Sequence, residues 1–188
     1  MRLFVAIEPP PEALAELAAV VAPLRTAAPD LRWSGRESWH LTLAFLGEVD
    51  EQVVPELDTR LGRAAGRHTS QLLAIDGGGA FPSLARARVI WAGIRGDRPA
   101  LAALAASIAA GARRAGAPPP DEGRKYRPHL TLARCKQPLD ATQLTRPLAG
   151  FTGDDWTAAS ISLVSSQLGS GPPRYQELAR WPLKPAPG

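Results

Sequence analysis

The sequence predicts an α+β fold of two pseudo-symmetric lobes, each a mixed or antiparallel β-sheet with helices on its outer face, around a central cleft. A strand-helix-loop-strand order occurs twice, in residues 2–47 and again in residues 88–135. Each unit ends on a strand that carries the pentapeptide His-Leu-Thr-Leu-Ala, at residues 40–44 and 129–133. Because repetition of a supersecondary unit indicates a duplicated architecture, residues 1–188 are expected to form one domain of two related lobes.

The first unit is expected to open with a strand over residues 2–7, where an apolar run stops at three prolines. Apolar residues at helical spacing then predict a helix over 11–27. A strand over 39–46 ends at a glycine, and a helix over 52–65 follows. A short strand over 72–75 is predicted to end in a turn at Asp76 and the three glycines after it.

The second unit repeats this order with a strand over 88–94, a helix over 99–114 and a strand over 127–135, after a proline-rich loop at 118–120. Two further strands are predicted over 159–165 and 175–181. The proline-rich residues 182–188 are expected to fray.

The composition is that of a soluble globular domain, with 45% hydrophobic and 21% charged residues. No run approaches the roughly 18 apolar residues of a membrane-spanning helix, and the first residues lack the pattern of a signal peptide. A cytoplasmic monomer without membrane contact or obligate protein partner is therefore expected. The net charge of +4 favours an anionic partner.

Cysteine and histidine are scarce. Cys135 is the single cysteine, which excludes an intramolecular disulfide. No third ligand stands at a spacing suited to a metal, so a metal site is not expected. Two of the three histidines, His40 and His129, open the repeated pentapeptides.

Alternate side chains of a strand share a face, so His40 and Thr42 point one way while the leucines between and after them point into the core. His129 and Thr131 do the same in the second copy. Two imidazoles and two hydroxyls across a cleft suit substitution at phosphorus. One imidazole activates the nucleophile, the other protonates the leaving oxygen, and the hydroxyls bind the nonbridging oxygens. The residues alone do not say which histidine is the acid.

A single His-x-Thr strand would more often be structural, but two copies in matched strands favour catalysis. Together with the 2–7 strand, Phe81-Pro82 and the 88–94 strand, the motifs resemble those of the two-histidine phosphoesterase superfamily. Within it, nearly the whole chain is similar to the RNA 2′,3′-cyclic phosphodiesterases, also called RNA 2′,5′-ligases.

The resemblance implies an RNA-processing hydrolase that needs neither metal nor cofactor. Its substrates would be RNA ends or nucleoside 2′,3′-cyclic phosphates, and it would convert the cyclic phosphate to a 2′-phosphate. In the reverse direction, the same site would join RNA ends through a 2′,5′ linkage.

By this resemblance His40 is the general acid that protonates the departing 3′ oxygen, and His129 is the general base that deprotonates water. Thr42 and Thr131 bind phosphate oxygens. Arg134 matches a family arginine beside the phosphate, although strict alternation puts it on the leucine face. A bulge or the end of the strand must therefore turn Arg134 toward the cleft.

Three residues have two interpretations each. Phe81 resembles an aromatic residue on which a terminal base stacks, or it is a hydrophobic plug. Arg127 and Tyr126 contact RNA, or they belong to the solvated surface.

Two other functions stay open at this point. The same mechanism would suit a small cyclic phosphate, such as ADP-ribose cyclic phosphate or a cyclic nucleotide. A noncatalytic nucleotide-binding or RNA-binding module is the third interpretation, and the two complete His-x-Thr pairs argue against it.

Overall fold

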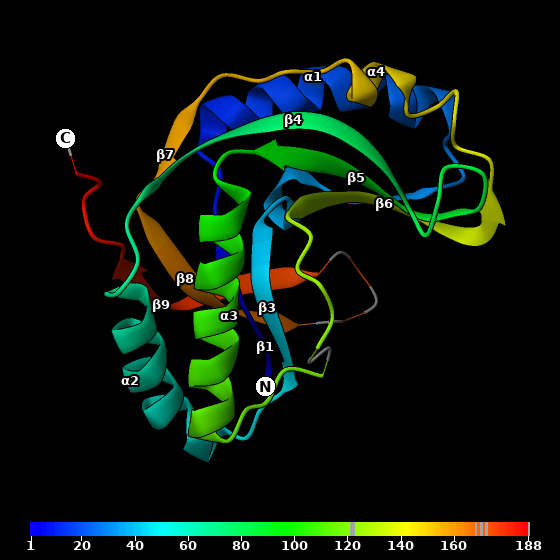
Figure 1. The fold of residues 1–188 in the computed structure, drawn as a ribbon. Coiled ribbons are helices and arrows are strands. Elements are labelled where there is room, and N and C mark those ends of the chain that lie inside the picture. Colours follow the sequence, from blue (N-terminus) through cyan, green and yellow to red (C-terminus); the bar gives the residue numbers. More distant parts are fainter. Residues whose placement is uncertain (121–122, 168, 170, 172, 188) are drawn as a thin grey trace.

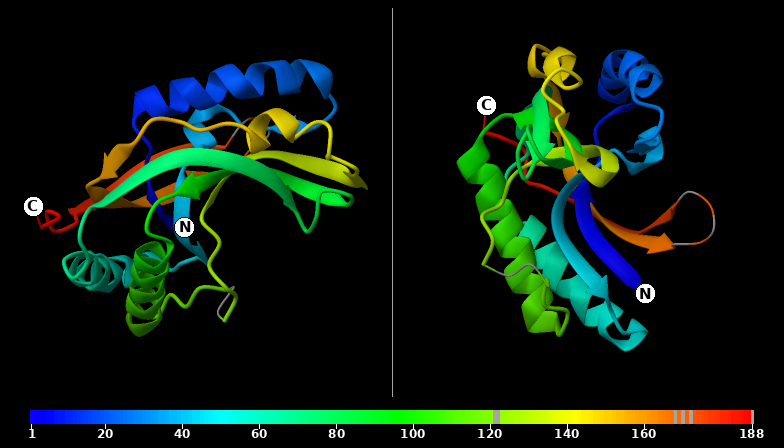
Figure 2. Two further views of the ribbon diagram at one scale, coloured as in Figure 1. Left: turned by 45° about the horizontal axis from the view of Figure 1, so that its top comes forward. Right: turned by 90° about the vertical axis from the view of Figure 1, so that its right-hand side faces the viewer.

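Two antiparallel sheets form the molecule, as the predicted α+β class requires. The computed structural model describes residues 1–120, 123–167, 169, 171 and 173–187 (Figure 1). One sheet has the strand order β3-β1-β8-β9, and the other has the order β2-β6-β5-β4-β7. The two sheets curve around each other, so strands far apart in the sequence lie close together (Figure 2).

The four-stranded sheet is built around the first strand of the chain. Its members are β1 (Arg2–Ile7), β3 (Leu41–Glu48), β8 (Ser160–Gln167) and β9 (Arg174–Pro182). In β1 the side chains of Leu3, Val5 and Ile7 enter the main core, whereas Phe4 and Ala6 join a small separate cluster on the other face. The alternation expected of a strand is therefore obeyed, with both faces covered.

The five-stranded sheet is built around the first strand of the second unit. Its members are β2 (Arg32–Trp33), β6 (His129–Leu139), β5 (Ala87–Arg95), β4 (Gln71–Phe81) and β7 (Trp156–Ala158). The short strands β2 and β7 had no clear signal in the sequence. They form because longer neighbours already present an open edge for pairing.

The helices are exchanged between the two sheets. The helical elements are α1 (Pro11–Ala27), α2 (Val54–Ala65), α3 (Arg98–Ala115), α4 (Arg146–Ala149) and the 3-10 turns η1 (Arg36–Ser38) and η2 (Glu51–Val53). Helix α1 follows a strand of the four-stranded sheet, yet it packs with α4 against β4 of the five-stranded sheet. Helix α3 follows a strand of the five-stranded sheet, yet it packs with α2 against the other sheet (Figure 1). Each repeated unit therefore supplies the helix that covers its partner.

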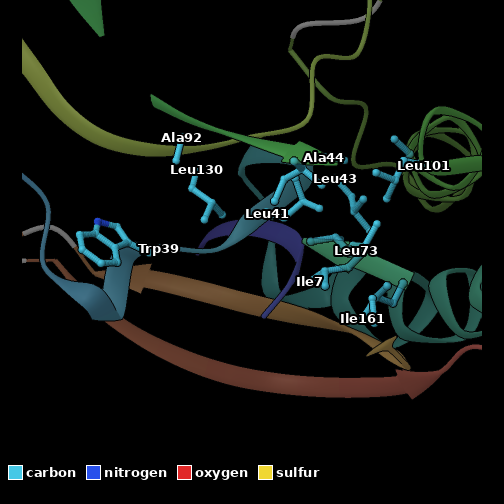
Figure 3. Packing of buried hydrophobic residues seen from close by; sticks show 14 of the residues in the cluster. Ile7, Trp39, Leu41, Leu43, Ala44, Leu73, Ala92, Leu101, Leu130 and Ile161 are labelled. Atoms are coloured by element: carbon cyan, nitrogen blue, oxygen red, sulfur yellow. The ribbon is translucent and has the colours of Figure 1, made fainter. Parts of the chain in front are cut away.

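One hydrophobic core joins both sheets. Ile7, Leu41 and Ile161 of the four-stranded sheet lie in the same cluster as Ala92 and Leu130 of the five-stranded sheet (Figure 3). All five side chains are almost fully buried. Burial of this apolar area is the main stabilising contribution, at roughly 25 cal/mol per Å² removed from water.

The glycine run after Asp76 was predicted as a turn, and this is wrong. Strand β4 continues through the run to Phe81, with a bulge near Gly77. A Cβ at Gly78 would lie 2.7 Å from the backbone oxygen of Trp91, and one at Gly79 would lie 2.8 Å from the Trp91 ring. The glycines permit this close packing inside the sheet.

The segment after β9 was expected to fray. The amide of Lys184 donates to the carbonyl of His68, and the amide of Ala186 donates to the Ser70 hydroxyl. Leu183, which directly precedes Lys184, is buried. The end of the expected range, Gly188, lies outside the described residues.

In the part of the chain that the structure describes, no helix combines the length and the apolar character needed to cross a membrane.

Candidate active site

The two histidine-bearing strands belong to different sheets and approach each other where the sheets meet. His40 directly precedes β3, and His129 is the first residue of β6. Both histidines and the threonines two positions later are partly exposed. The leucines of the motifs are buried, namely Leu41, Leu43, Leu130 and Leu132. The core face and the open face of each motif are therefore those that alternation predicts.

Strand β6 carries a β-bulge inside its motif. The register with β5 shifts between Thr131 and Ala133, which leaves Leu132 as the extra residue. Leu132 and Ala133 are both buried, so alternation resumes one position later and Arg134 shares the face of Thr131. Arg134 is exposed, and its charge acts on His129. Of the two expected ways of turning Arg134, a bulge or the end of the strand, the structure shows the bulge.

Strand β3 carries the same bulge at the same position of its motif. Its register with β1 shifts at Leu43, and Phe45 then lies on the face of Thr42. Phe45 is thus the counterpart of Arg134 in the other lobe. The guanidinium of Arg2 lies 4.9 Å from the centre of the Phe45 ring. The two halves of the site share a backbone path and differ in charge.

His40 lies in an aromatic setting. Its ring stacks on Phe4 at 4.6 Å between centroids, and the Tyr175 ring stands edge-on at 5.1 Å. Phe4 and Tyr175 also contact each other. Because this burial removes water from the charged form, it lowers the pKa of His40 to about 4. His40 is therefore neutral at pH 7 in the unliganded protein.

His129 is oriented by a backbone hydrogen bond. Its Nδ1 lies 2.7 Å from the carbonyl oxygen of Arg127. A carbonyl only accepts, so Nδ1 carries the proton and Nε2 of the neutral ring has a free lone pair. Burial lowers the pKa of His129, the bond to Arg127 opposes that effect, and the positive charge of Arg134 lowers the pKa further.

Phe81 packs against His129 at the mouth of the site. The two rings meet edge-to-face at 5.0 Å between centroids, and the Trp91 ring lies 5.2 Å from that of Phe81. The Arg127 guanidinium lies 5.8 Å from the Phe81 ring centre. Phe81 therefore packs against His129 and is also partly exposed.

Tyr126 connects the two lobes. Its hydroxyl donates to the carbonyl oxygen of Thr42 at 3.1 Å. Burial raises the pKa of Tyr126, so the hydroxyl keeps its proton and remains a donor. This bond fixes the segment before His129 against the strand that follows His40.

A groove of about 910 Å³ opens beside these residues. We call it the α3 groove, because α3 forms one wall. The other surfaces come from β3, from Phe81 and His129, and from the segment that leads into β6. The described residues that line it are Thr42, Leu43, Ala44, Phe45, Phe81, Ala102, Ala105, Ala106, Ala109, Arg113, Pro119, Gly123, Arg124, Lys125, Tyr126, Arg127 and His129. Of the described site residues, His40, Thr131 and Arg134 lie outside this lining.

A family model described as LigT-like phosphoesterase matches residues 7–91 and 95–175. The chain belongs to this family. It is 35% identical over 150 residues to the RNA 2′,3′-cyclic phosphodiesterase of Escherichia coli K12. The match covers 78% of this chain and 77% of that protein. The chain is also 34% identical to the RNA 2′,3′-cyclic phosphodiesterase of Aeropyrum pernix. That match covers 76% of this chain and 80% of the relative.

The fold agrees with the family. The crystal structure of E. coli LigT complexed with 3′-AMP superposes with a TM-score of 0.79 at 32% identity, and the match covers 97% of each chain. In this LigT-like phosphoesterase, the open faces of the two motif strands carry imidazoles, hydroxyls and the Arg134 guanidinium. Such a set suits a phosphate group. Among the described residues, no group of three or more His, Cys, Asp or Glu side chains is placed to hold a metal ion.

The predicted residues fall into two groups around this LigT-like site. Thr42, His129, Phe81, Tyr126 and Arg127 line the groove. The remaining three lie outside the lining: His40 directly precedes β3, and Thr131 and Arg134 share the open face of β6.

The sequence interpretation missed the residues that surround His40. Phe4 alternates with core residues in the first strand, so its parity could have assigned it to the open face. Tyr175 comes from the last strand of the sheet and has no local signal. Phe45 could have been found by aligning the two motifs, since it occupies the position of Arg134.

Proposed function

We propose that this LigT-like phosphoesterase hydrolyses the terminal 2′,3′-cyclic phosphate of RNA to a 2′-phosphate. The observation that carries the proposal is the pair of His-x-Thr strands, one from each sheet, which have matching bulges and contact each other where the sheets meet. The activity named for the E. coli and A. pernix relatives supports the same conclusion.

His129 is the proposed general base. Its Nδ1 proton is held by the Arg127 carbonyl, so the lone pair on Nε2 is available to take a proton from water. The same bond stabilises the imidazolium that forms. A base held in one tautomer reacts without first having to reorient.

His40 is the proposed general acid. Burial against Phe4 and Tyr175 disfavours its proton in the unliganded protein. A bound phosphodiester supplies a negative charge that raises the pKa of a neighbouring imidazole. Protonated His40 is therefore formed mainly in the substrate complex, where it is needed.

The proposed reaction is a single in-line substitution. The water oxygen bonds to phosphorus while the bond from phosphorus to the 3′ oxygen breaks. The proton of water passes to His129, and His40 gives its proton to the 3′ oxygen. Thr42, Thr131 and Arg134 stabilise the charge on the nonbridging oxygens.

With a 5′-hydroxyl in the place of water, the same substitution forms a 2′,5′ linkage, so we include RNA ligation in the proposal. A role in RNA processing, a cytoplasmic location and a monomeric state remain predictions from the sequence.

The decisive experiment replaces each histidine. His40→Ala and His129→Ala should each lower kcat on a nucleoside 2′,3′-cyclic phosphate by about 10²–10⁴-fold, because each removes one proton-transfer group. The assay contains a chelator, and phosphorus NMR identifies the product as the 2′- or the 3′-phosphate.

The matched control is His68→Ala, since His68 bonds Ser107 instead of facing the site. It should retain the activity of the unaltered protein. Full turnover by either of the other two variants, or a 3′-phosphate product, would overturn the proposal.

A further inference from the structure

A second arginine lies opposite Arg134 on the open face of the five-stranded sheet. Strand β2 pairs with β6 in the register Arg32 to Arg134 and Trp33 to Ala133. Residues directly opposite each other in an antiparallel pair have Cβ atoms about 4.5–5.5 Å apart on one face of the sheet. Arg134 shares the face of Thr131, so Arg32 lies on that face too. We call Arg32 and Arg134 the arginine pair.

The two charges of the arginine pair are uncompensated in the part of the chain that the structure describes. Both side chains are exposed. Neither guanidinium has an ion pair with a described residue, and this includes Asp30 and Glu37, the acids that stand nearest to Arg32 in the sequence. Like charges directly opposite each other destabilise a sheet. An anion bound beside the pair would remove this repulsion.

Other contacts hold β2 in the register that brings the two charges together. The amide of Ser34 donates to the carbonyl of Leu132 at 2.8 Å, beside the bulge of β6. The indole N–H of Trp33 donates to the carbonyl of Ala28 at 2.8 Å. The guanidinium of Arg25 donates to the carbonyl of Ser34. A local repulsion that the rest of the fold overcomes is typical of a functional site.

The arginine pair lies beside the proposed reaction site. Burial lowers the pKa of His129 and the charge of Arg134 lowers it further, so these two side chains lie within electrostatic range. Phe81 pairs with Val89, which pairs with Arg134, and the Phe81 ring contacts the ring of His129. Side chains of this row across the sheet therefore extend to His129. On the other side, β2 leads through η1 to His40.

The negative charge on phosphorus increases during the proposed reaction. A 2′,3′-cyclic phosphate is a diester and carries one negative charge. The charge approaches two while water gives its proton to His129 and its oxygen bonds to phosphorus. The 2′-phosphate product is a monoester, which carries close to two charges at about pH 8. Two guanidinium groups therefore match the transition state and the product better than the substrate.

We propose that Arg32 binds the phosphoryl group together with Arg134, and that the arginine pair favours the doubly charged forms of this group over the singly charged substrate. This inference rests on the proposed function, because the transition state of that reaction is the form that the pair would stabilise.

The first test replaces Arg32 and measures turnover of adenosine 2′,3′-cyclic phosphate. Arg32→Gln should lower kcat about 10–100-fold and change KM by less than about threefold, because the lost contact is made mainly in the transition state. Arg32→Lys keeps the charge without the planar fork, so it should recover part of the loss. The matched control is Arg63→Gln on the exposed surface of α2, which should keep the kcat of the unaltered protein.

The second test measures binding without turnover. Adenosine 2′-phosphate is doubly charged at about pH 8, whereas its methyl ester has nearly the same shape and one charge. Isothermal titration calorimetry of the unaltered protein should give a Kd about tenfold lower for the phosphate than for the methyl ester. Arg32→Gln should reduce this ratio about fivefold, and Arg63→Gln should leave it unchanged.

The outcomes distinguish this proposal from the proposed function. Absence of turnover by the unaltered protein would contradict the proposed function, while calorimetry would still measure the preference for the doubly charged ligand. A ratio that Arg32→Gln leaves unchanged would overturn the role of Arg32, because Arg32 would then not distinguish one charge from two. An unchanged kcat in Arg32→Gln would overturn it as well.

Discussion

Identical motif residues acquire different properties from their surroundings. His40 and His129 open the same pentapeptide, but only His129 has a backbone acceptor for its ring N–H in the described structure. His40 instead contacts the rings of Phe4 and Tyr175. The pentapeptide thus supplies two equivalent imidazoles, and their neighbours fix the tautomer of His129 and desolvate His40.

The burial of His40 predicts a pH-dependent stability. Burial lowers its pKa in the folded protein from 6.5 to about 4. Between these values the unfolded chain binds the proton and the folded chain does not, so stability falls as the pH drops through this interval. His40→Gln should lose less stability, by up to about 3 kcal/mol.

Urea unfolding at about pH 7 and about pH 4.5 measures this difference. The carboxylates titrate in both proteins, so their contribution cancels in the comparison. An equal loss of unfolding free energy in His40→Gln and the unaltered protein would refute the desolvation of His40.

One extra residue in each motif strand decides which side chains lie on its open face. The bulge in β6 turns Arg134 to the open face, and the bulge in β3 does the same for Phe45. Without these bulges both side chains would enter the core. Glycines in β4 and β5 have a different role, because they let neighbouring backbones approach closely.

Gly93 pairs with His129 across β5 and β6. A Cβ at this position would lie 2.5 Å from the backbone oxygen of Asp76, which cannot rotate away. Gly93→Ala should therefore lower the unfolding free energy by about 1–3 kcal/mol. Urea titration followed by circular dichroism gives the value.

Gly150→Ala is the matched control, since nothing lies within 4 Å of a Cβ there. It should leave stability within about 0.5 kcal/mol of the unaltered protein. If both variants unfolded at the same urea concentration, the close contact at Gly93 would not constrain the sheet.

The two lobes depend on each other, because each supplies the helix that covers the sheet of the other. Helix α1 covers the five-stranded sheet, and α3 covers the four-stranded sheet, although each follows a strand of the other. Neither repeated unit can bury its sheet without the other. The shared core reinforces this dependence.

The protein should therefore unfold in one cooperative transition. Hydrogen exchange in increasing urea compares peptides from β1 with peptides from β5, one in each sheet. Their unfolding midpoints should coincide, together with that of circular dichroism. Two separated midpoints would show that the lobes are independently stable.

Much of the architecture follows from local pattern. The bounds of the 2–7 strand and the 11–27 helix were predicted as the structure has them. The division of each His-Leu-Thr-Leu motif into a core face and an open face was also predictable. Side-chain alternation and helical periodicity depend only on neighbouring residues, so one sequence contains enough information to assign them.

Other features required the tertiary structure. Contacts between distant residues decide which sheet each helix covers and where a bulge shifts the register. They also decide how β4 continues through its glycines. The same holds for the rings of Phe4 and Tyr175 around His40. The sequence alone determined a duplicated fold with two histidines on open strand faces. Only the tertiary structure decided what surrounds them, with Phe4 and Tyr175 from two other strands of its sheet around His40 and the Arg127 carbonyl at His129. Desolvation and hydrogen bonding depend on the groups that surround a side chain in space.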